Sequence, residues 1–288
     1  MKELTDIGVI RDVLDRNGFR FSKSMGQNFL TAPWVPQRIA DEAGLDGSTG
    51  VLEIGPGIGC LTVQLSSRAG RVLSVELDKK LMPILAETLS GYENVEVLFG
   101  DILKQDIAAL VRDNFAGMRP VVCANLPYNV TSPVLTKLLT SGVIEETTVM
   151  VQREVARRIC AEPGTADYSA FSIMCAWYCD REILFDVPPD CFVPRPKVTS
   201  SVIKLKRRPA PPAEVKDEEL FFRVVKAAFA QRRKTLLNAL SAGFPGLSRA
   251  DIEGALTASG ISADVRGETL GIYEFAQICD YIGGVMQH

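Results

Sequence analysis

Histidine is almost absent from this sequence, whose single residue of this type is His288, the last of the chain. Chain ends are usually mobile, so we expect no histidine in a catalytic centre and no metal site. This argues against Ser-His-Asp and Cys-His nucleophilic catalysis and against metal binding through imidazole. Any chemistry must depend on carboxylates, amides, aromatic side chains and a cofactor.

Long apolar runs are missing as well. No stretch reaches the roughly 18 apolar residues that a membrane-spanning helix needs, and residues 1–6 lack the charged-then-apolar order of a secretory signal. We therefore expect a cytoplasmic protein that does not bind membranes. The seven cysteines are odd in number and mostly lie within apolar runs, which favours reduced core thiols over disulfides. They are Cys60, Cys123, Cys160, Cys175, Cys179, Cys191 and Cys279.

A strong net charge is lacking too, since 288 residues carry a formal charge of only -3. The distribution is uneven, because the segment 195–234 holds 12 Lys and Arg against 4 Asp and Glu. Clustered positive charge on an otherwise acidic protein favours contact with phosphates. A solvated charged surface is the alternative.

From about residue 50 onward, short β-branched runs alternate with longer segments of helical period, which is typical of a doubly wound α/β domain. The pattern predicts a seven-stranded, mostly parallel, Rossmann-like sheet, preceded by helices near residues 6–17 and 33–43. The predicted strands are 51–54, 71–75, 95–99, 121–124, 147–151, 183–186 and 201–205.

A proline-rich stretch over residues 207–213 can neither continue a strand nor begin a helix easily. We interpret residues 1–206 as the main domain with its helical N-terminal extension, 207–216 as a linker and 217–288 as a small all-helical domain. Amphipathic runs at 217–230, 234–242, 248–259 and 273–283 predict its helices.

A glycine-rich turn follows the first predicted strand of the sheet. Gly55, Gly57 and Gly59 allow positive φ and close approach of the backbone to a ligand. The dinucleotide fingerprint would require glycine at position 60, where this chain has Cys60. A nucleoside without phosphates therefore fits better than a pyrophosphate, although a turn without a ligand is an alternative.

Two acids end the next strands. Glu76 can accept both hydroxyls of a ribose, and Asp101 can accept the exocyclic amine of an adenine. Either acid could instead only cap a helix. With the glycine turn, these elements resemble class I S-adenosylmethionine-dependent methyltransferases. We assign cofactor contacts to Gln27, Asn28, Leu30, Glu53, Gly55, Gly57, Glu76, Leu77, Asp101, Ile102 and Asn125.

The tetrapeptide Asn125-Leu126-Pro127-Tyr128 follows the fourth strand and has the form of the amino-methyltransferase signature. An exocyclic adenine nitrogen is a poor nucleophile because its lone pair is delocalised. The Asn125 side-chain oxygen and the Leu126 carbonyl can accept its two N–H bonds and direct the lone pair at a methyl group. Pro127 fixes the turn and Tyr128 stacks on an extruded base, so we assign these four residues to catalysis.

Further candidates lie outside this tetrapeptide. Phe192 is placed to close the opposite face of the base, unless it is only a core residue, and the segment 27–30 could cover the cofactor. RNA contacts are predicted on one helix face and in one basic cluster, with solvated surface as the alternative. These residues are Arg153, Arg157, Arg158, Arg232, Arg233 and Lys234.

The ordered motifs resemble the ribosomal RNA adenine dimethyltransferase family, and within it the bacterial small-subunit, kasugamycin-sensitivity type. The resemblance runs from residue 23 to about 205, with Met25, Ile58 and Cys60 as minor departures. It is carried by 26–30, 53–57, 76–78, 100–101, 125–133, 152–156 and 192–198. It implies that S-adenosylmethionine contacts Asn28, Leu30, Gly55, Glu76, Asp101 and Asn125.

The same resemblance implies the substrate. Two adjacent adenosines in a hairpin loop near the 3′ end of 16S rRNA would each be dimethylated within an immature 30S subunit, by an enzyme that we expect to be monomeric. Alternatives are the macrolide-resistance type, which methylates 23S rRNA, a DNA adenine methyltransferase and a non-catalytic ribosome-assembly factor.

Overall fold

The computed structural model describes residues 3–20 and 27–286. His288 lies outside the described residues, as do Met25 and Gly26, which belong to the region of family resemblance. The chain forms two compact units, one comprising Met1–Ala156 with Glu182–Arg207 and the other Arg157–Arg181 with Arg208–His288.

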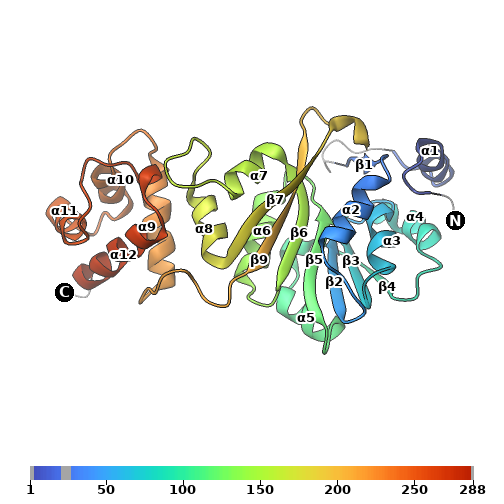
Figure 1. Ribbon diagram of the computed structural model, residues 1–288, viewed down its shortest axis with the longest axis horizontal. Helices are drawn as coiled ribbons and strands as arrows, with labels where there is room; N and C mark the ends of the chain where they lie inside the picture. The colour runs from blue at the N-terminus through green and yellow to red at the C-terminus, as the bar shows by residue number, and fades with distance from the viewer. Residues whose placement is uncertain (1–2, 21–26, 287–288) are drawn as a thin grey trace. The chain divides into compact units, whose positions relative to one another are not determined.

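The first unit contains the predicted sheet (Figure 1), whose seven strands are in the order β4-β3-β2-β5-β6-β9-β7. All seven predicted strands are confirmed. The pairs β2–β3, β3–β4, β2–β5 and β5–β6 are parallel and β6–β9 is antiparallel, which confirms the mostly parallel α/β fold. The strands are β2 (Thr49–Ile54), β3 (Arg71–Glu76), β4 (Val95–Phe99), β5 (Arg119–Asn125), β6 (Glu146–Gln152), β7 (Cys179–Val187) and β9 (Ser200–Arg207).

The strand order reverses between β2 and β5. The chain adds β3 and β4 on one side of β2 and then crosses to place β5 on the other side. In open α/β sheets, ligands bind beyond the carboxyl ends of the strands at such a switch point. The topology therefore brings the ends of β2, β3, β4 and β5 to one crevice.

Helices pack against this sheet through apolar stripes. Val35 and Ile39 of α2 share a buried core with Val51 of β2 and Val121 of β5. The predicted helices near 6–17 and 33–43 are confirmed, and Asp6 caps the first of them by accepting from the Val9 N–H at 3.0 Å. The helices are α1 (Ile7–Arg16), α2 (Trp34–Glu42), α3 (Cys60–Ser66), α4 (Met82–Thr88), α5 (Ile107–Asn114), α6 (Thr131–Thr140) and α7 (Arg153–Ile159), the last continuing into the second unit.

Two very short strands, β1 (Phe29–Leu30) and β8 (Phe192–Val193), were not predicted. They pair antiparallel, with Phe29 opposite Val193 and Leu30 opposite Phe192. Two residues cannot show a hydrophobic period, so only the tertiary structure reveals this pair. It ties the segment before α2 to the segment before β9.

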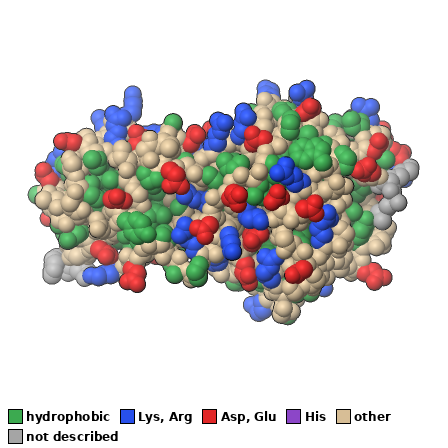
Figure 2. All heavy atoms as spheres, viewed as in Figure 1, with side chains coloured by type: hydrophobic (Ala, Val, Ile, Leu, Met, Phe, Trp, Pro, Cys, Tyr) green, Lys and Arg blue, Asp and Glu red, His purple; other side chains and the backbone are tan. Residues whose placement is uncertain are grey.

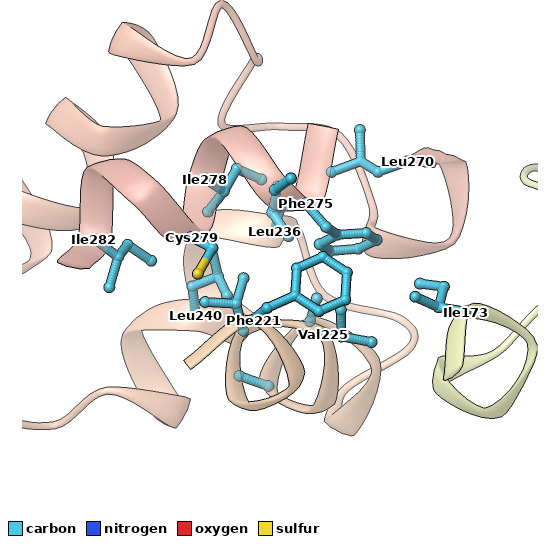
Figure 3. Close-up of a cluster of buried hydrophobic side chains, with 14 of the residues drawn as sticks. Ile173, Phe221, Val225, Leu236, Leu240, Leu270, Phe275, Ile278, Cys279 and Ile282 are labelled. Atoms are coloured by element: carbon cyan, nitrogen blue, oxygen red, sulfur yellow. The ribbon is translucent and has the colours of Figure 1, made fainter. Parts of the chain in front are cut away.

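The second unit is helical and has its own core. It contains α8 (Ala170–Tyr178), α9 (Glu218–Ala230), α10 (Leu236–Gly243), α11 (Arg249–Ala258) and α12 (Ile272–Met286). All four helices predicted for the tail are confirmed. Figure 3 shows Phe221, Phe275 and Cys279 gathered in this core together with Ile173.

The division between the units differs from the expected boundary at residue 206 in one segment. Residues 157–181 group with the tail rather than with the sheet. The physical reason is aromatic packing, because Trp177 of α8 stacks on Phe221 of α9 with ring centroids 4.2 Å apart. The extent of each functional domain stays a prediction.

The cysteines are all free, as predicted, and six of the seven are buried. Burial raises the pKa of the Cys60 thiol to about 12. The described helices include none that is both long and apolar enough to cross a membrane.

Candidate functional site

A cavity of about 240 Å³ lies at the carboxyl ends of β2, β3, β4 and β5, within the first unit. Every residue assigned to cofactor binding lines it, from Gln27 to Asn125, and so does the whole tetrapeptide 125–128. The fold therefore joins the predicted cofactor and acceptor residues in one cavity.

The glycine turn after β2 forms part of the cavity wall. Gly55, Gly57 and Gly59 have φ values of +72°, +61° and +94°, which side chains of L-residues rarely tolerate. A Cβ on Gly57 would lie 3.2 Å from the Phe29 ring, so the absence of a side chain at Gly57 also leaves room for this ring. Cys60 is 8% exposed and donates to the Leu4 carbonyl at 3.0 Å, so it begins α3 as a core residue.

Glu76, at the end of β3, is 6% exposed and faces the cavity. Its Oε1 accepts from the Asp78 N–H at 2.7 Å, and the Gly57 N–H also contributes a hydrogen bond. Burial raises the pKa of Glu76 and these N–H donors oppose the rise. A buried carboxylate held by backbone donors presents a fixed pair of acceptors, as a ribose would require.

Glu53, at the end of β2, is more deeply buried at 1% exposure. Its Oε2 accepts from the hydroxyls of Thr62, at 2.7 Å, and Ser74, at 2.6 Å. Burial raises its pKa to about 7 despite these two donors. Neither hydroxyl was singled out from the sequence, although each lies on an element that flanks β2.

Asp101 caps a short helix and also lines the cavity. Its Oδ1 accepts from the Leu103 N–H at 3.0 Å and so caps the short helix η3 (Ile102–Lys104). The same residue lines the cavity with Ile102 and Leu103. The cap holds the carboxylate in place through Oδ1 alone.

The segment 27–30 lines the cavity and is held at several points. The Gln27 amide donates to Asp78 at 2.8 Å, and the Asn28 carbonyl accepts from Asn125 Nδ2 at 3.4 Å. The pairing of β1 with β8 adds a third connection. The segment thus contacts the loop after β3 through Asp78 and the tetrapeptide through Asn125.

The tetrapeptide forms a fixed turn after β5. The Leu126 N–H donates to the Met150 carbonyl at 3.1 Å, and the Pro127 carbonyl accepts from the Val130 N–H at 3.2 Å. Because the Asn125 amide nitrogen is directed to Asn28, its oxygen is the atom left to accept from a ligand. Tyr128 is partly buried, and its hydroxyl lies 2.6 Å from that of Ser200.

Phe192 does not line this cavity. Its side chain is 4% exposed and packs in the apolar core of the first unit, while its backbone pairs with Leu30. The alternative considered for it, a core aromatic, describes this placement. A role for Phe192 in stacking on the base stays a prediction that requires its ring to move.

The candidate RNA-binding arginines have different surroundings. Arg153 and Arg157 are exposed on α7, and Arg153 lies 3.8 Å from Asp186. Arg232 pairs with Glu268 at 2.9 Å and also donates to the Ala166 carbonyl, so it has a structural role. Arg158 is partly buried, and Arg233 and Lys234 are exposed.

The basic segment 195–234 is partly neutralised by acids of the same unit. Lys204 lies 3.7 Å from Glu146, and Arg208 lies 2.6 Å from Asp180. On the face seen in Figure 2, basic and acidic side chains are intermixed. Some of the positive charge counted in this segment is therefore paired with acidic side chains and is less available to phosphates.

Several cavity residues were not predicted from the sequence. Leu103 directly follows the predicted pair Asp101 and Ile102, and Val130 and Val134 lie one helical turn apart at the start of α6. Their spacing was a usable signal, but apolar residues at such positions are far more often core. Within the described part of the chain, no group of three His, Cys, Asp or Glu side chains could hold a metal ion.

The chain is similar to known families and proteins over most of its length. A family model for ribosomal RNA adenine dimethylase matches residues 18–282. The chain is 48% identical over 281 residues to a ribosomal RNA small subunit methyltransferase A from Geobacillus thermodenitrificans, covering 96% of each protein. It is 47% identical to the protein of the same name from Listeria monocytogenes, covering 99% of each.

Solved structures show the same fold. The crystal structure of a dimethyladenosine transferase from Plasmodium falciparum matches with a TM-score of 0.70 at 25% identity, covering 87% of this chain and 95% of that one. The 23S rRNA methyltransferase ErmE matches with a TM-score of 0.65 at 28% identity, covering 88% and 99%.

Proposed function

The chain belongs to the ribosomal RNA adenine dimethylase family, and from this premise we propose that it dimethylates N6 of two adjacent adenosines in the 3′-terminal hairpin loop of 16S rRNA. The methyl donor is S-adenosylmethionine. The observation that carries the proposal is that Glu76, Asp101 and the tetrapeptide 125–128 line the same cavity. The small-subunit names of relatives at 47–48% identity favour 16S rRNA over 23S rRNA.

The cavity residues fit S-adenosylmethionine. Glu76 is a buried carboxylate suited to ribose hydroxyls, and Asp101 is a second lining carboxylate that can accept from an adenine amine. Gly57 has no side chain that would crowd the cavity wall. The bound cofactor supplies an electrophilic methyl group on a sulfonium. The protein contributes orientation of the two reactants, since no side chain needs to attack the methyl group.

Asn125 and Leu126 direct the acceptor nitrogen. With its amide nitrogen donated to Asn28, Asn125 offers its oxygen to one N–H of adenine, and the Leu126 carbonyl takes the other. Tyr128 supplies a ring face for the extruded base. No general base is required, because N6 becomes acidic enough on methylation to lose its proton to water. Among the residues that the structure describes, no histidine lines the cavity.

The RNA partner is bound through phosphate contacts. We assign these contacts to exposed cations, among them Arg153, Arg157 and Arg233. We further propose that the protein acts as a cytoplasmic monomer on 30S subunits without a metal ion. These assignments extend beyond the family relationship and have their own tests.

A methyl-transfer assay tests the proposal directly. Hypomethylated 30S subunits incubated with radiolabelled S-adenosylmethionine should yield N6,N6-dimethyladenosine on nucleoside analysis. Primer extension should stop in the small-subunit RNA. Stops in the large-subunit RNA alone would instead support the macrolide-resistance activity, and transfer to duplex DNA but not to 30S subunits would support a DNA methyltransferase.

Replacing Asn125 by alanine tests its assigned role. Because Asn125→Ala removes an acceptor used in the transition state, we expect kcat to fall by about 10²- to 10³-fold. Binding to 30S subunits, measured by filtration, should remain. Unchanged transfer by Asn125→Ala would refute the role of the side chain, and loss of particle binding would point to a structural defect.

A further inference from the structure

The hydroxyl of Tyr128 has a buried partner that belongs to neither the tetrapeptide nor the cofactor residues. It shares a hydrogen bond of 2.6 Å with Ser200 Oγ. Ser200 is the first residue of β9 and is fully buried, with 0% exposure. The two residues are 72 positions apart in the chain, so the contact is tertiary.

The strand order explains how these residues meet. Tyr128 lies in the turn after β5, and β6 separates β5 from β9 in the sheet. At the end of β6, Gln152 pairs with Ser200. The hydrogen bond therefore spans the end of β6 and ties the acceptor turn to the strand beyond it.

This bond fixes the ring of Tyr128. The hydrogen bonds of Leu126 and Val130 hold the backbone on both sides of the residue. A second anchor at the hydroxyl leaves the ring little freedom of orientation. Burial also raises the pKa of Tyr128, so the phenol keeps its proton.

On the premise of the proposed function, we propose that Ser200 is a positioning residue for methyl transfer: its hydroxyl holds the Tyr128 ring at the angle at which the ring stacks on the target adenine. The phenol hydroxyl then forms its hydrogen bond with the protein and not with the substrate. The base meets only the face of the ring, while Asn125 and Leu126 contact its polar edge.

The next residue, Ser201, provides a matched comparison. It is also fully buried on β9, but its hydroxyl donates to Asp186 at 2.5 Å and not to Tyr128. Ser200→Ala and Ser201→Ala each remove one buried hydroxyl from the same strand. Only the first change affects the contact with the acceptor turn.

A double-mutant cycle tests the proposal with hypomethylated 30S subunits. Ser200→Ala and Tyr128→Phe should each lower kcat by about five- to tenfold, the effect of losing one hydrogen bond in the transition state. The KM for S-adenosylmethionine should stay within about twofold in both. The double variant should be no slower than the slower single variant, because both changes break the same bond. Ser201→Ala should retain the kcat of the unmodified protein.

Several outcomes would overturn the proposal. Additive losses in the double variant would show that the two hydroxyls act separately, and an unchanged kcat in Ser200→Ala would show that the bond has no effect on transfer. A loss shared equally by Ser201→Ala would indicate general damage to β9. If Ser200→Ala fails to fold, an unchanged kcat in Tyr128→Phe would still refute the proposal. An unmodified protein without transfer activity would refute the proposed function instead.

Discussion

Glu53 and Glu76 end neighbouring strands and line the same cavity, yet their carboxylates have different partners. Glu76 accepts from backbone N–H groups of its own loop and of the glycine turn. Glu53 accepts from the hydroxyls of Thr62 and Ser74. Burial raises the pKa of Glu53 by more than the two hydroxyl hydrogen bonds lower it, so Glu53 retains a proton to higher pH than a free carboxyl.

The stability of the protein should therefore depend on Glu53 in a defined pH window. Its pKa rises from 4.5 in the unfolded chain to about 7 in the folded state. The folded state thus binds the proton more tightly, and ionisation reduces the free energy of unfolding as the pH rises from 4.5 through 7. Glu53→Gln should be more stable than the unmodified protein at pH 8, by an amount on the order of 3 kcal/mol at most.

Urea unfolding at pH 4.5 and pH 8 would measure this difference. The two proteins should be closest in stability at the lower pH, where Glu53 is protonated in the folded state and about half protonated in the unfolded chain. Glu182→Gln, which changes an exposed carboxylate, is the matched control and should show no such divergence. An equal stability difference at both pH values would contradict the assignment.

At the scale of elements, the glycine turn after β2 has two separate requirements at Gly57. The backbone has positive φ, and the missing Cβ leaves room for the Phe29 ring. Gly117 also has positive φ, but a Cβ there would meet no atom within 4 Å. Substitutions at Gly57 and Gly117 therefore distinguish the effect of backbone strain from the effect of steric crowding by a neighbouring side chain.

Gly57→Ala should lower the affinity for S-adenosylmethionine by about tenfold or more, because a left-handed alanine costs about 1 to 2 kcal/mol and its methyl group presses on Phe29. Gly117→Ala should lose comparable stability and keep its affinity. Isothermal titration and thermal unfolding of both variants would measure this contrast. Equal affinities in the two variants would show that the turn tolerates a side chain at Gly57.

Elements with a clear period were predictable, and pairings between distant short segments were not. The range 95–99 of β4 was predicted residue for residue, since a short apolar run in which Val95 and Val97 flank Glu96 indicates a strand without tertiary information. The two-residue strands β1 and β8 are stabilised only by each other. Similarly, α8 joins the helical unit because of Trp177, whose partner Phe221 is far away in the sequence.

In the candidate site, too, the contacts between residues distant in the sequence were the part that could not be predicted. Motif residues at strand ends, such as Glu76 and Asn125, were brought together because the topology of a doubly wound sheet determines where strand ends meet. The burial of Phe192 in the core could not be predicted, because a hairpin sequence does not show which way a side chain turns. Arg232 was assigned to RNA without knowledge of Glu268, an ion-pair partner that only the folded chain brings near.

At the scale of the whole molecule, RNA binding must operate with little net charge. The formal net charge is -3, and many cations have acidic neighbours. Exposed cations such as Arg157 and Arg233 form no ion pair with any residue that the structure describes. Local positive charge, and not the overall charge, must then produce the attraction to phosphates.

Affinity for hypomethylated 30S subunits should fall linearly with the logarithm of the salt concentration. Arg157→Gln and Arg233→Gln should each weaken binding and reduce the slope by about one, because each removes one phosphate contact. Arg112→Gln is the control, since Arg112 is 71% exposed but paired with Asp113 at 2.8 Å. Salt-independent affinity, or equal effects of all three changes, would contradict the assigned contacts.

The hydrogen bond from Asn125 to the Asn28 carbonyl has a thermodynamic consequence. It joins the segment that lines the cofactor part of the cavity to the side chain that receives the acceptor base. If occupancy of one part strengthens or weakens this bond, the affinity of the other part changes by the same factor in both directions. Cofactor and rRNA would then bind cooperatively. The Asn125 side-chain amide would be the group that couples their two affinities in the ternary complex.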